Sequence, residues 1–306
     1  MRVLVIGAGV TGLSVGVRLV EQGYDVHLLA RDLPLETTSS VAAAIWYPYL
    51  IQPLDRVLGW SRRSFEVFSG LAADPDSGVT MRPGTELLRT RVIEPTWASI
   101  VSDFTRLGEV PPGYEDGWSF TTPVIEMPVY LQWLQRRLEV AGGTLTRKVL
   151  AALPNQADLV VNCAGLGSRL LAADATLTPV RGQVVRLAQV GLDRWLLDGE
   201  GLTYVVPRAD DVIVGGTDTE DAWDRRPDPA IAAEIMSRAI TLVPQLAGAA
   251  VLGHRVGLRP ARPAVRLEVE QQGRQGVIHC YGHGGAGVTT SWGCADEVLS
   301  MVEAAP

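Results

Sequence analysis

The chain has only three cysteines among its 306 residues, Cys163, Cys280 and Cys294. Three cysteines do not supply the disulfide framework of a small secreted protein. Their spacing also lacks the short repeats that are typical of zinc sites. Because each cysteine lies in an apolar stretch, the sequence predicts three buried free thiols in a reducing compartment, and no metal site.

The chain also lacks an excess of positive charge and a long hydrophobic run. It has 27 Lys and Arg against 34 Asp and Glu, a formal net charge of −7, which argues against a nucleic-acid partner. No segment of the sequence has the length and apolarity of a membrane span. Glycines interrupt residues 1–20 and no small-residue cleavage site follows, which argues against a signal peptide. We therefore expect a cytoplasmic protein with no membrane partner.

The N-terminal sequence is typical of a dinucleotide-binding unit. Residues 2–6 are an apolar run, Gly7, Gly9 and Gly12 follow, and residues 13–20 have helical periodicity. Glycines permit a tight turn, and the N-terminus of the helix binds a pyrophosphate. A lone pattern of this kind is weak, but its place between a strand and a helix strengthens the prediction.

A second apolar run, residues 25–30, ends at Arg31 and Asp32. Asp32 lies 20 residues after Gly12, about where an acid binds a ribose hydroxyl of a dinucleotide. Because a basic residue beside the acid is typical of sites that bind the 2′-phosphate of NADP, Arg31 leaves NADP as an alternative cofactor. A purely structural glycine turn is the other alternative, which the surrounding pattern disfavours.

Another glycine-rich turn lies near the C-terminus. The apolar residues 277–281 lead into four glycines between positions 282 and 287, and a helical pattern follows at residues 294–302. Glycine backbone lets a flat or anionic group approach closely, and a helix N-terminus carries partial positive charge. The α/β pieces of the chain are far apart, whereas NAD dehydrogenases usually keep them contiguous. We therefore favour FAD, whose flavin end needs a second anchor.

Between the two turns the parallel α/β rhythm gives way to antiparallel patterns. Helical periodicity occurs at residues 127–141 and 229–243, a hairpin pattern at residues 203–214, and a buried strand with a glycine turn at residues 157–167. We predict an α/β fold in which a Rossmann-like FAD-binding domain is assembled from separated segments, with an interleaved antiparallel-sheet substrate domain. The predicted boundaries are residues 1–44, 142–180 and 260–306 for the FAD-binding domain and residues 45–141 and 181–259 for the substrate-binding domain.

Arg259 and Tyr204 are candidates for substrate binding. Arg259 lies between Leu258 and Pro260, which predicts a partly buried guanidinium that needs an anion. The anion is either a substrate carboxylate held by the planar fork or a protein acid in a structural ion pair, and the sequence favours neither. The hydroxyl of Tyr204, on the predicted hairpin, is placed to share a carboxylate, although a strand tyrosine is more often a core residue.

Residues 45–49 are apolar and aromatic and would wall an apolar pocket, but for Trp46 and Tyr49 we favour ordinary packing. His279 and His283 are predicted to contact the flavin or to pack, because no cysteine or carboxylate at ligand spacing supports a metal. No nucleophile with a neighbouring base is evident, so the cofactor is expected to carry the chemistry.

Several ordered motifs make the chain resemble the D-amino acid oxidase family of flavoproteins over essentially its full length. They are Val277-Ile-His-Cys-Tyr-Gly-His-Gly-Gly-Ala-Gly with Gly293-Cys-Ala295, Gly257-Leu-Arg-Pro-Ala-Arg-Pro263, Tyr204-Val-Val-Pro207, Arg181-Gly-Gln183, and residues 30–34 and 37–44. Cys280 departs from the usual Asn. The resemblance implies non-covalent FAD and oxidative deamination of D-amino acids. Hydride passes from Cα to flavin N5, and O2 is the acceptor. The products are a 2-oxo acid, ammonia and hydrogen peroxide.

The resemblance also implies a set of site residues and no catalytic side chain. Arg259 and Tyr204 bind the substrate carboxylate, and the carbonyl of Gly285 takes the amino group. The implied substrate-binding residues are Ile45, Tyr47, Tyr204, Arg259 and Gly285. The implied FAD-binding residues are Gly7, Ala8, Gly9, Val10, Thr11, Gly12, Arg31, Asp32, Thr38, Ser39, Ala43, Ala44, Ile45, Leu166, Gly182, Arg259, Gly284, Gly285, Gly287, Val288 and Thr289.

Besides Cys280, three more positions depart from the pattern of the family. Glu200 and Asp218 stand where members of the family carry a second tyrosine, and Tyr47 stands where mammalian members carry Gln. Because two acids would repel a second carboxylate, we expect neutral, apolar D-amino acids to be favoured. A D-aspartate, glycine or sarcosine oxidase, a quinone-linked D-amino acid dehydrogenase and a non-catalytic nucleotide-binding protein remain alternatives, and a homodimer remains open.

Overall fold

The structure, a computed structural model, describes residues 1–155, 157–272 and 275–304. One mixed sheet runs through this part of the chain. In sheet order its strands are β4 (Thr105–Arg106), β5 (Asp116–Ile125), β3 (Val79–Leu88), β9 (Trp195–Asp198), β10 (Thr203–Pro207), β11 (Asp211–Gly215), β8 (Thr178–Ala188), β13 (Val251–Gln272), β14 (Gln275–His283), β7 (Leu159–Asn162), β1 (Arg2–Ile6), β2 (Asp25–Ala30) and β6 (Thr144–Arg147), with β12 (Thr219–Glu220) paired to β8.

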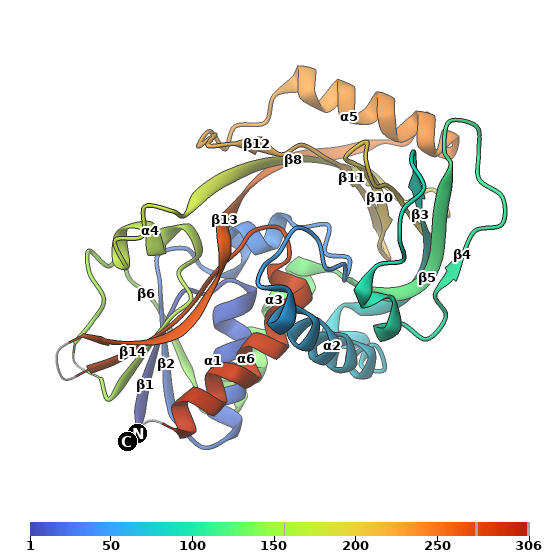
Figure 1. Cartoon of the computed structure of the whole chain (residues 1–306). Helices are drawn as coiled ribbons and strands as arrows, with labels where there is room; N and C mark the ends of the chain where they lie inside the picture. The colour runs from blue at the N-terminus through green and yellow to red at the C-terminus, as the bar shows by residue number, and fades with distance from the viewer. Residues whose placement is uncertain (156, 273–274, 305–306) are drawn as a thin grey trace.

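The helices lie on both sides of this sheet (Figure 1). They are α1 (Val10–Glu21), α2 (Leu54–Leu71), α3 (Met127–Val140), α4 (Ser168–Leu171), α5 (Pro229–Leu242) and α6 (Gly287–Glu303). Helices α1, α2, α3 and α6 gather below the sheet in that view, and α5 lies above its far end. The predicted helices at 127–141 and 229–243 and the predicted hairpin at 203–214 are confirmed by α3, α5 and the β10–β11 pair.

The N-terminal unit has the predicted strand–turn–helix–strand order. Strand β1 pairs in parallel with β2 and β7, and β14 pairs in parallel with β7. Gly7 has φ +112°, a conformation that favours glycine. A Cβ at Gly12 would lie 2.1 Å from the carbonyl oxygen of Gly7, so only glycine lets α1 begin this close to the turn. The separated α/β pieces therefore meet in one parallel part of the sheet.

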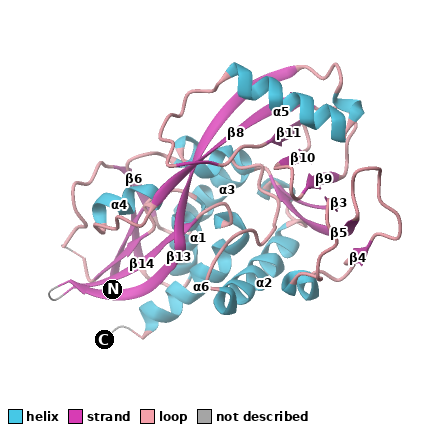
Figure 2. Cartoon of the chain, turned by 45° about the horizontal axis from the view of Figure 1, so that its top comes forward, coloured by secondary structure: helices cyan, strands magenta, loops and turns pink. Residues whose placement is uncertain are grey.

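Strands β8 and β13 are long, antiparallel partners that join this parallel part to the antiparallel part (Figure 2). Their register places Gly257 opposite Gly182 and Arg259 opposite Val180. The predicted domain boundaries at 180/181 and 259/260 fall inside these two strands. The polypeptide thus crosses between the predicted domains within continuous strands, and the assignment of the boundaries stays a prediction.

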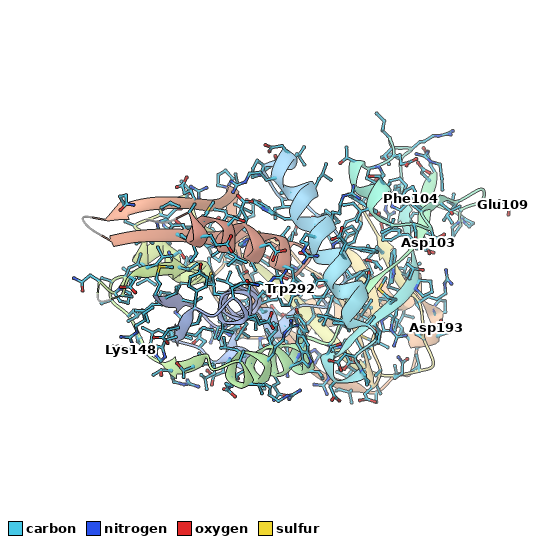
Figure 3. All side chains as sticks on the ribbon, turned by 90° about the horizontal axis from the view of Figure 1, so that it is seen from below. Asp103, Phe104, Glu109, Lys148, Asp193 and Trp292 are labelled. Atoms are coloured by element: carbon cyan, nitrogen blue, oxygen red, sulfur yellow. The ribbon has the colours of Figure 1, made fainter. Side chains whose placement is uncertain are left out.

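The interior beneath the sheet is built around α6. Trp292 is 1% exposed and its Nε1–H donates to the Tyr130 hydroxyl at 2.8 Å, near the centre of Figure 3. A Cβ at Gly293 would lie 2.2 Å from Cα of Trp60. The backbones of α2 and α6 are therefore in direct contact at this glycine. This packing fixes where the first turn of α6 points. Within the described residues, no helix is both long and apolar enough to cross a membrane.

Candidate cofactor and substrate site

A cavity of about 1040 Å³ lies between the two glycine-rich turns. Most of the predicted FAD-binding residues line it: Gly7, Ala8, Gly9, Val10, Thr11, Arg31, Asp32, Thr38, Ser39, Leu166, Gly182, Arg259, Gly284, Gly285, Gly287 and Val288. Tyr204, predicted to bind substrate, also lines it. The predicted residues Gly12, Ala43, Ala44, Ile45, Tyr47 and Thr289 lie outside this lining. Lys148, Trp223 and Arg225 line it without having been predicted, because no local motif marks them and only the topology brings them here.

One end of the cavity is formed by the start of α1. Gly9 is the residue before this helix, and the Val10 N–H donates to Ser39 Oγ at 3.0 Å. Thr38 Oγ1 donates to the carbonyl of Leu258 at 3.1 Å, which ties the same segment to β13. Backbone N–H groups and the positive end of the helix face this place, so it suits an anionic pyrophosphate.

Arg31 and Asp32 directly follow β2 and line the cavity. Their side chains pair with each other, with Arg31 Nη2 2.6 Å from Asp32 Oδ2. The hydrogen bond to Asp32 raises the pKa of Arg31, although partial burial opposes the shift. Since Asp32 already neutralises Arg31, the pair favours a ribose hydroxyl over a 2′-phosphate at this place.

Arg259 reaches the other end of the cavity from β13. Its Nη1–H donates to the carbonyl of Thr217 at 2.8 Å, and its guanidinium lies over Gly182, where a Cβ would come within 2.5 Å of Nη2. A Cβ at Gly285 would lie 3.6 Å from Arg259 Cδ. Within the described parts of the chain, no acid forms an ion pair with Arg259. The structural ion pair is therefore disfavoured, and an anion from outside the chain fits this guanidinium.

Tyr204 lies beside this guanidinium. Its ring covers the backbone of Gly215 and Gly216, where added Cβ atoms would lie 2.3 Å and 2.8 Å from ring carbons. Burial raises the pKa of Tyr204, while the charge of Arg259 and a hydrogen bond to it partly oppose the shift. The hydroxyl therefore stays protonated and can donate to an oxygen bound by Arg259.

Tyr47 turns its hydroxyl away from this cavity. The hydroxyl donates to the buried Glu86 carboxylate, with both oxygens at 2.8 Å, and Trp118 Nε1–H donates to the same group. Burial raises the pKa of Glu86 and, together with Glu86, that of Tyr47. The backbone of Tyr47 exchanges two hydrogen bonds with Thr289 Oγ1, at 3.1 Å and 3.0 Å. Thr289 thus fastens the 45–49 segment to the start of α6.

Tyr49 lies near Gly285 and Asp218. The packing predicted for residues 46 and 49 is confirmed for Trp46, which is fully buried, and is wrong for Tyr49, which is 40% exposed. A Cβ at Gly285 would lie 3.9 Å from Tyr49 Cδ1. Partial burial, followed by the nearby charge of Asp218, raises the pKa of Tyr49. The segment that follows residue 49 shows no periodic pattern, so the sequence could not place this ring.

Glu200 and the two arginines that follow Arg259 in β13, Arg262 and Arg266, have different surroundings. Glu200 is exposed and accepts a hydrogen bond from Thr90 Oγ1 at 2.7 Å. Arg262 pairs with Asp174 at 2.9 Å, and Arg266 pairs with Glu268 at 2.7 Å. Both arginines thus have structural ion pairs, unlike Arg259.

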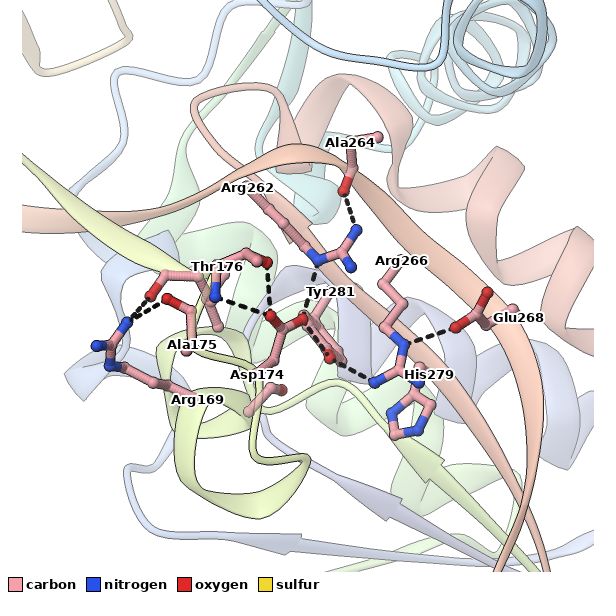
Figure 4. A network of polar contacts seen from close by, with 12 residues as sticks. Arg169, Asp174, Ala175, Thr176, Arg262, Ala264, Arg266, Glu268, His279 and Tyr281 are labelled. Carbon is pink, nitrogen blue, oxygen red and sulfur yellow. Dashed lines mark hydrogen bonds and ion pairs between the residues drawn. The ribbon is translucent and has the colours of Figure 1, made fainter.

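Asp174 is the centre of the polar network in Figure 4. It accepts hydrogen bonds from Thr176, from Arg262 Nε at 2.9 Å and from the Tyr281 hydroxyl at 2.9 Å, and Arg266 donates to Tyr281 at 3.0 Å. Burial alone would raise the pKa of Asp174, but these hydrogen bonds hold it well below its ordinary value. The network fixes Tyr281, which lines the cavity.

The two histidines of the C-terminal turn differ. His279 is fully buried between Asn162 and Glu270, where burial and then Arg266 lower its pKa, so it packs as a neutral ring. His283 lines the cavity. The three cysteines are buried free thiols, as predicted. Sequence spacing missed one grouping: Cys280, His283 and Cys294 converge, because α6 folds back against the end of β14.

The lining fits FAD. Gly284 has φ +54°, and no described atom lies within 4 Å of the place where its Cβ would be. The backbone of Gly284 therefore borders open space at the cavity. Gly285 and Gly287 continue this bare backbone up to the first turn of α6. Two helix N-termini, one at each glycine turn, thus face a single long cavity. Such a cavity accommodates a pyrophosphate at one end and a flat ring at the other.

Comparison with known proteins agrees with this geometry. The family model described as FAD dependent oxidoreductase matches residues 2–301. A D-amino-acid oxidase of Rubrobacter xylanophilus is 51% identical, covering 99% of this chain and 96% of its own length. A D-amino-acid oxidase of Streptomyces coelicolor is 43% identical (98% and 96%), and a D-aspartate oxidase of Homo sapiens is 39% identical (98% and 94%).

Among solved structures, the fold resembles glycine oxidase from Geobacillus kaustophilus, with a TM-score of 0.85 at 20% identity, covering 100% of this chain and 95% of that one. Glycine oxidase from Bacillus cereus gives a TM-score of 0.82 at 19% identity, covering 99% and 95%. These likenesses confirm the predicted α/β fold. Together with the match over residues 2–301, they establish that the chain belongs to the family of FAD-dependent oxidoreductases and uses FAD as its cofactor.

Proposed function

We propose that the protein is a D-amino-acid oxidase, which deaminates D-amino acids oxidatively with O2 as the acceptor. The observation that carries this proposal is Arg259, a half-buried guanidinium at the cavity end that has no acid partner among the described residues. It lies beside Tyr204 and Gly285. The relatives that are 51% and 43% identical carry this name and support the proposal.

In the proposed mechanism the side chains bind and orient, and none acts as a base. Arg259 and Tyr204 hold the substrate carboxylate, with the guanidinium fixed by the Thr217 carbonyl. The backbone carbonyl of Gly285 accepts a hydrogen bond from the amino group. Two of the substituents on Cα are thereby fixed, so only one enantiomer presents its Cα–H bond to the cofactor. The glycine turns at residues 7–12 and 284–288 would hold FAD, which would supply the hydride-accepting and O2-reducing chemistry when bound.

We further propose that the pocket favours neutral, apolar D-amino acids. Asp218 is exposed beside Tyr49 at the substrate end, and its charge opposes a second carboxylate on the substrate. Catalytic efficiencies on D-valine, D-methionine and D-aspartate test this preference. D-aspartate as the best of the three would instead favour the activity in the name of the 39% identical human relative.

We also propose how the chain is divided between cofactor and substrate, and where it works. Residues 1–44, 142–180 and 260–306 form the FAD-binding part and residues 45–141 and 181–259 the substrate-binding part, a division supported by the parallel pairing of β14, β7, β1, β2 and β6. The three free thiols support a reducing, cytoplasmic compartment. Partners are the D-amino acid and O2, and light scattering decides between a monomer and a homodimer.

An anaerobic spectrum tests the activity most directly. The visible flavin absorption of the purified protein is expected to bleach when D-alanine is added without O2, and to return when air is admitted with release of hydrogen peroxide. L-alanine is the matched control and is expected to leave the spectrum unchanged. Bleaching by L-alanine and not by D-alanine would overturn the stereochemistry, and no bleaching by either would favour a non-catalytic flavin protein.

A further inference from the structure

A compact cysteine–histidine cluster lies behind the C-terminal glycine turn. Cys280 lies in β14, His283 ends that strand, and Cys294 faces both from α6. Their ligand atoms all lie within 4.8 Å of one another, and all three residues are buried. The Cys294 Sγ is 3.6 Å from His283 Nε2. Hydrogen bonds also join Cys280 to Cys294 and to His283.

These atoms match the donor set of a soft metal site. Two thiolates and one imidazole are ligands that zinc-like ions prefer over carboxylates and waters. From Zn–S and Zn–N bond lengths of about 2.3 Å and 2.0–2.1 Å, tetrahedral coordination places neighbouring sulfur and nitrogen atoms about 3.5 Å apart. The Cys294–His283 separation is already close to this value, so little movement would be needed.

We propose that Cys280, His283 and Cys294 form a binding site for a thiophilic divalent cation of the zinc group. On binding, the two thiols each lose a proton and form a metal–sulfur bond, and the neutral imidazole forms a metal–nitrogen bond. Two protons are released per ion and nothing is oxidised or reduced. Three protein ligands leave a fourth position for water.

The cluster borders the cofactor cavity, through which an ion can reach it. Cys280 and His283 also line the cofactor cavity, so an ion can reach the thiols from that side. Cys163 lines the same cavity and is hydrogen bonded to Cys280, but it does not belong to the group of three. It is therefore a matched control: a neighbouring buried thiol whose removal leaves all three ligands in place.

The experiment is a Cd²⁺ titration of the full-length protein, both with FAD and after FAD has been removed. We expect one Cd²⁺ per chain by metal analysis after dialysis, an ultraviolet cadmium–thiolate absorption band, and two protons released per ion. Binding is expected to be faster without FAD. Cys280→Ala and Cys294→Ala are expected to weaken Cd²⁺ binding at least roughly a hundredfold, because each removes a ligand. Cys163→Ala is expected to stay within about threefold of the unchanged protein.

Three results would overturn the proposal: no thiolate band with or without FAD, a band that survives in both Cys280→Ala and Cys294→Ala, or a band lost equally in Cys163→Ala. Far-ultraviolet circular dichroism and FAD content show whether each variant is folded. If a cysteine variant does not fold, His283→Gln decides, since it removes the nitrogen ligand and keeps every thiol. Loss of the proton release and of tight binding in His283→Gln supports the site, and their retention contradicts it.

Discussion

Arg259, Arg262 and Arg266 all lie in β13 but have three different surroundings. Arg262 and Arg266 each meet protein carboxylates, whereas Arg259 meets the Thr217 carbonyl and the open end of the cavity. The motif alone could not separate Arg259 from Arg262, because Asp174, the acid that pairs with Arg262, comes from a distant part of the chain. A guanidinium without an acid retains its capacity for bidentate binding of a ligand carboxylate.

Replacing Arg259 is expected to damage substrate binding and to leave FAD binding largely intact. Arg259→Ala removes a charged hydrogen-bonding partner of the substrate carboxylate, which costs on the order of 3 kcal/mol, or roughly a hundredfold in kcat/KM. The effect is expected mainly in KM, measured by steady-state kinetics with D-alanine. Arg255→Ala, which removes an exposed arginine of the same strand, is the control and is expected to change KM little. An unchanged KM in Arg259→Ala would contradict binding of the substrate carboxylate by Arg259 and would favour a structural role.

At the scale of elements, local patterns predicted α1, α3, α5 and α6 but not the long helix α2 or most of the antiparallel strands. Residues 2–30 have strong periodicity and a glycine turn and were placed correctly, and the helix predicted at residues 294–302 is present but begins earlier, at Gly287. Contacts that depend on long-range register were not predictable. The position of Tyr49 beside Gly285 is one, because it depends on how residues 45–49 lie against the C-terminal glycine turn. The approach of Cys294 to Cys280 is another, because it depends on how α6 folds back on β14.

The pairing of β8 with β13 sets the position of the Arg259 guanidinium. Gly182→Ala would put a methyl group 2.5–2.7 Å from the guanidinium atoms, so the side chain must move away. Because this end of the side chain is flexible, we expect a KM increase on the order of tenfold, or about 1.4 kcal/mol, with little loss of stability. In the Arg259→Ala background, Gly182→Ala should change KM no further. Additive effects in this double-mutant cycle would contradict the contact.

The Asp174 network joins the segment after α4 to β13 and β14. Because the folded-state pKa of Asp174 lies below its ordinary value of 3.8, the carboxylate contributes stability above about pH 4 and loses it as the pH falls. Asp174→Asn is expected to lower the free energy of unfolding by about 2 kcal/mol at pH 7, with a smaller deficit at pH 3. Urea unfolding with FAD in excess measures it. Asp193→Asn, at an exposed acid, is the control, and a deficit independent of pH would contradict the charge-based explanation.

At the scale of the whole molecule, one sheet carries both glycine turns. The turn after β1 and the turn after β14 lie on strands separated only by β7, although almost the full chain separates them in sequence. Composition and periodicity predicted two separated anchors for one cofactor. The continuity of β8 and β13 across the predicted boundaries could not be predicted, since single-strand patterns contain no register between distant strands.

This arrangement predicts that FAD holds distant parts of the folded chain together. A ligand that binds only the folded state at 100 times its Kd adds about 2.7 kcal/mol, which for a chain of this size raises Tm by roughly 5 °C. Scanning calorimetry of the FAD-depleted protein, with and without added FAD, measures this rise. ADP lacks the flavin and would leave the backbone of residues 284–288 without a ligand, so at the same free concentration it should give a smaller rise than FAD. If ADP and FAD at the same multiple of their respective Kd gave equal increases, this would follow from mass action alone. The discriminating quantity is therefore the ratio of their Kd values, which should favour FAD, and equal Kd values would contradict a flavin contact at the C-terminal turn.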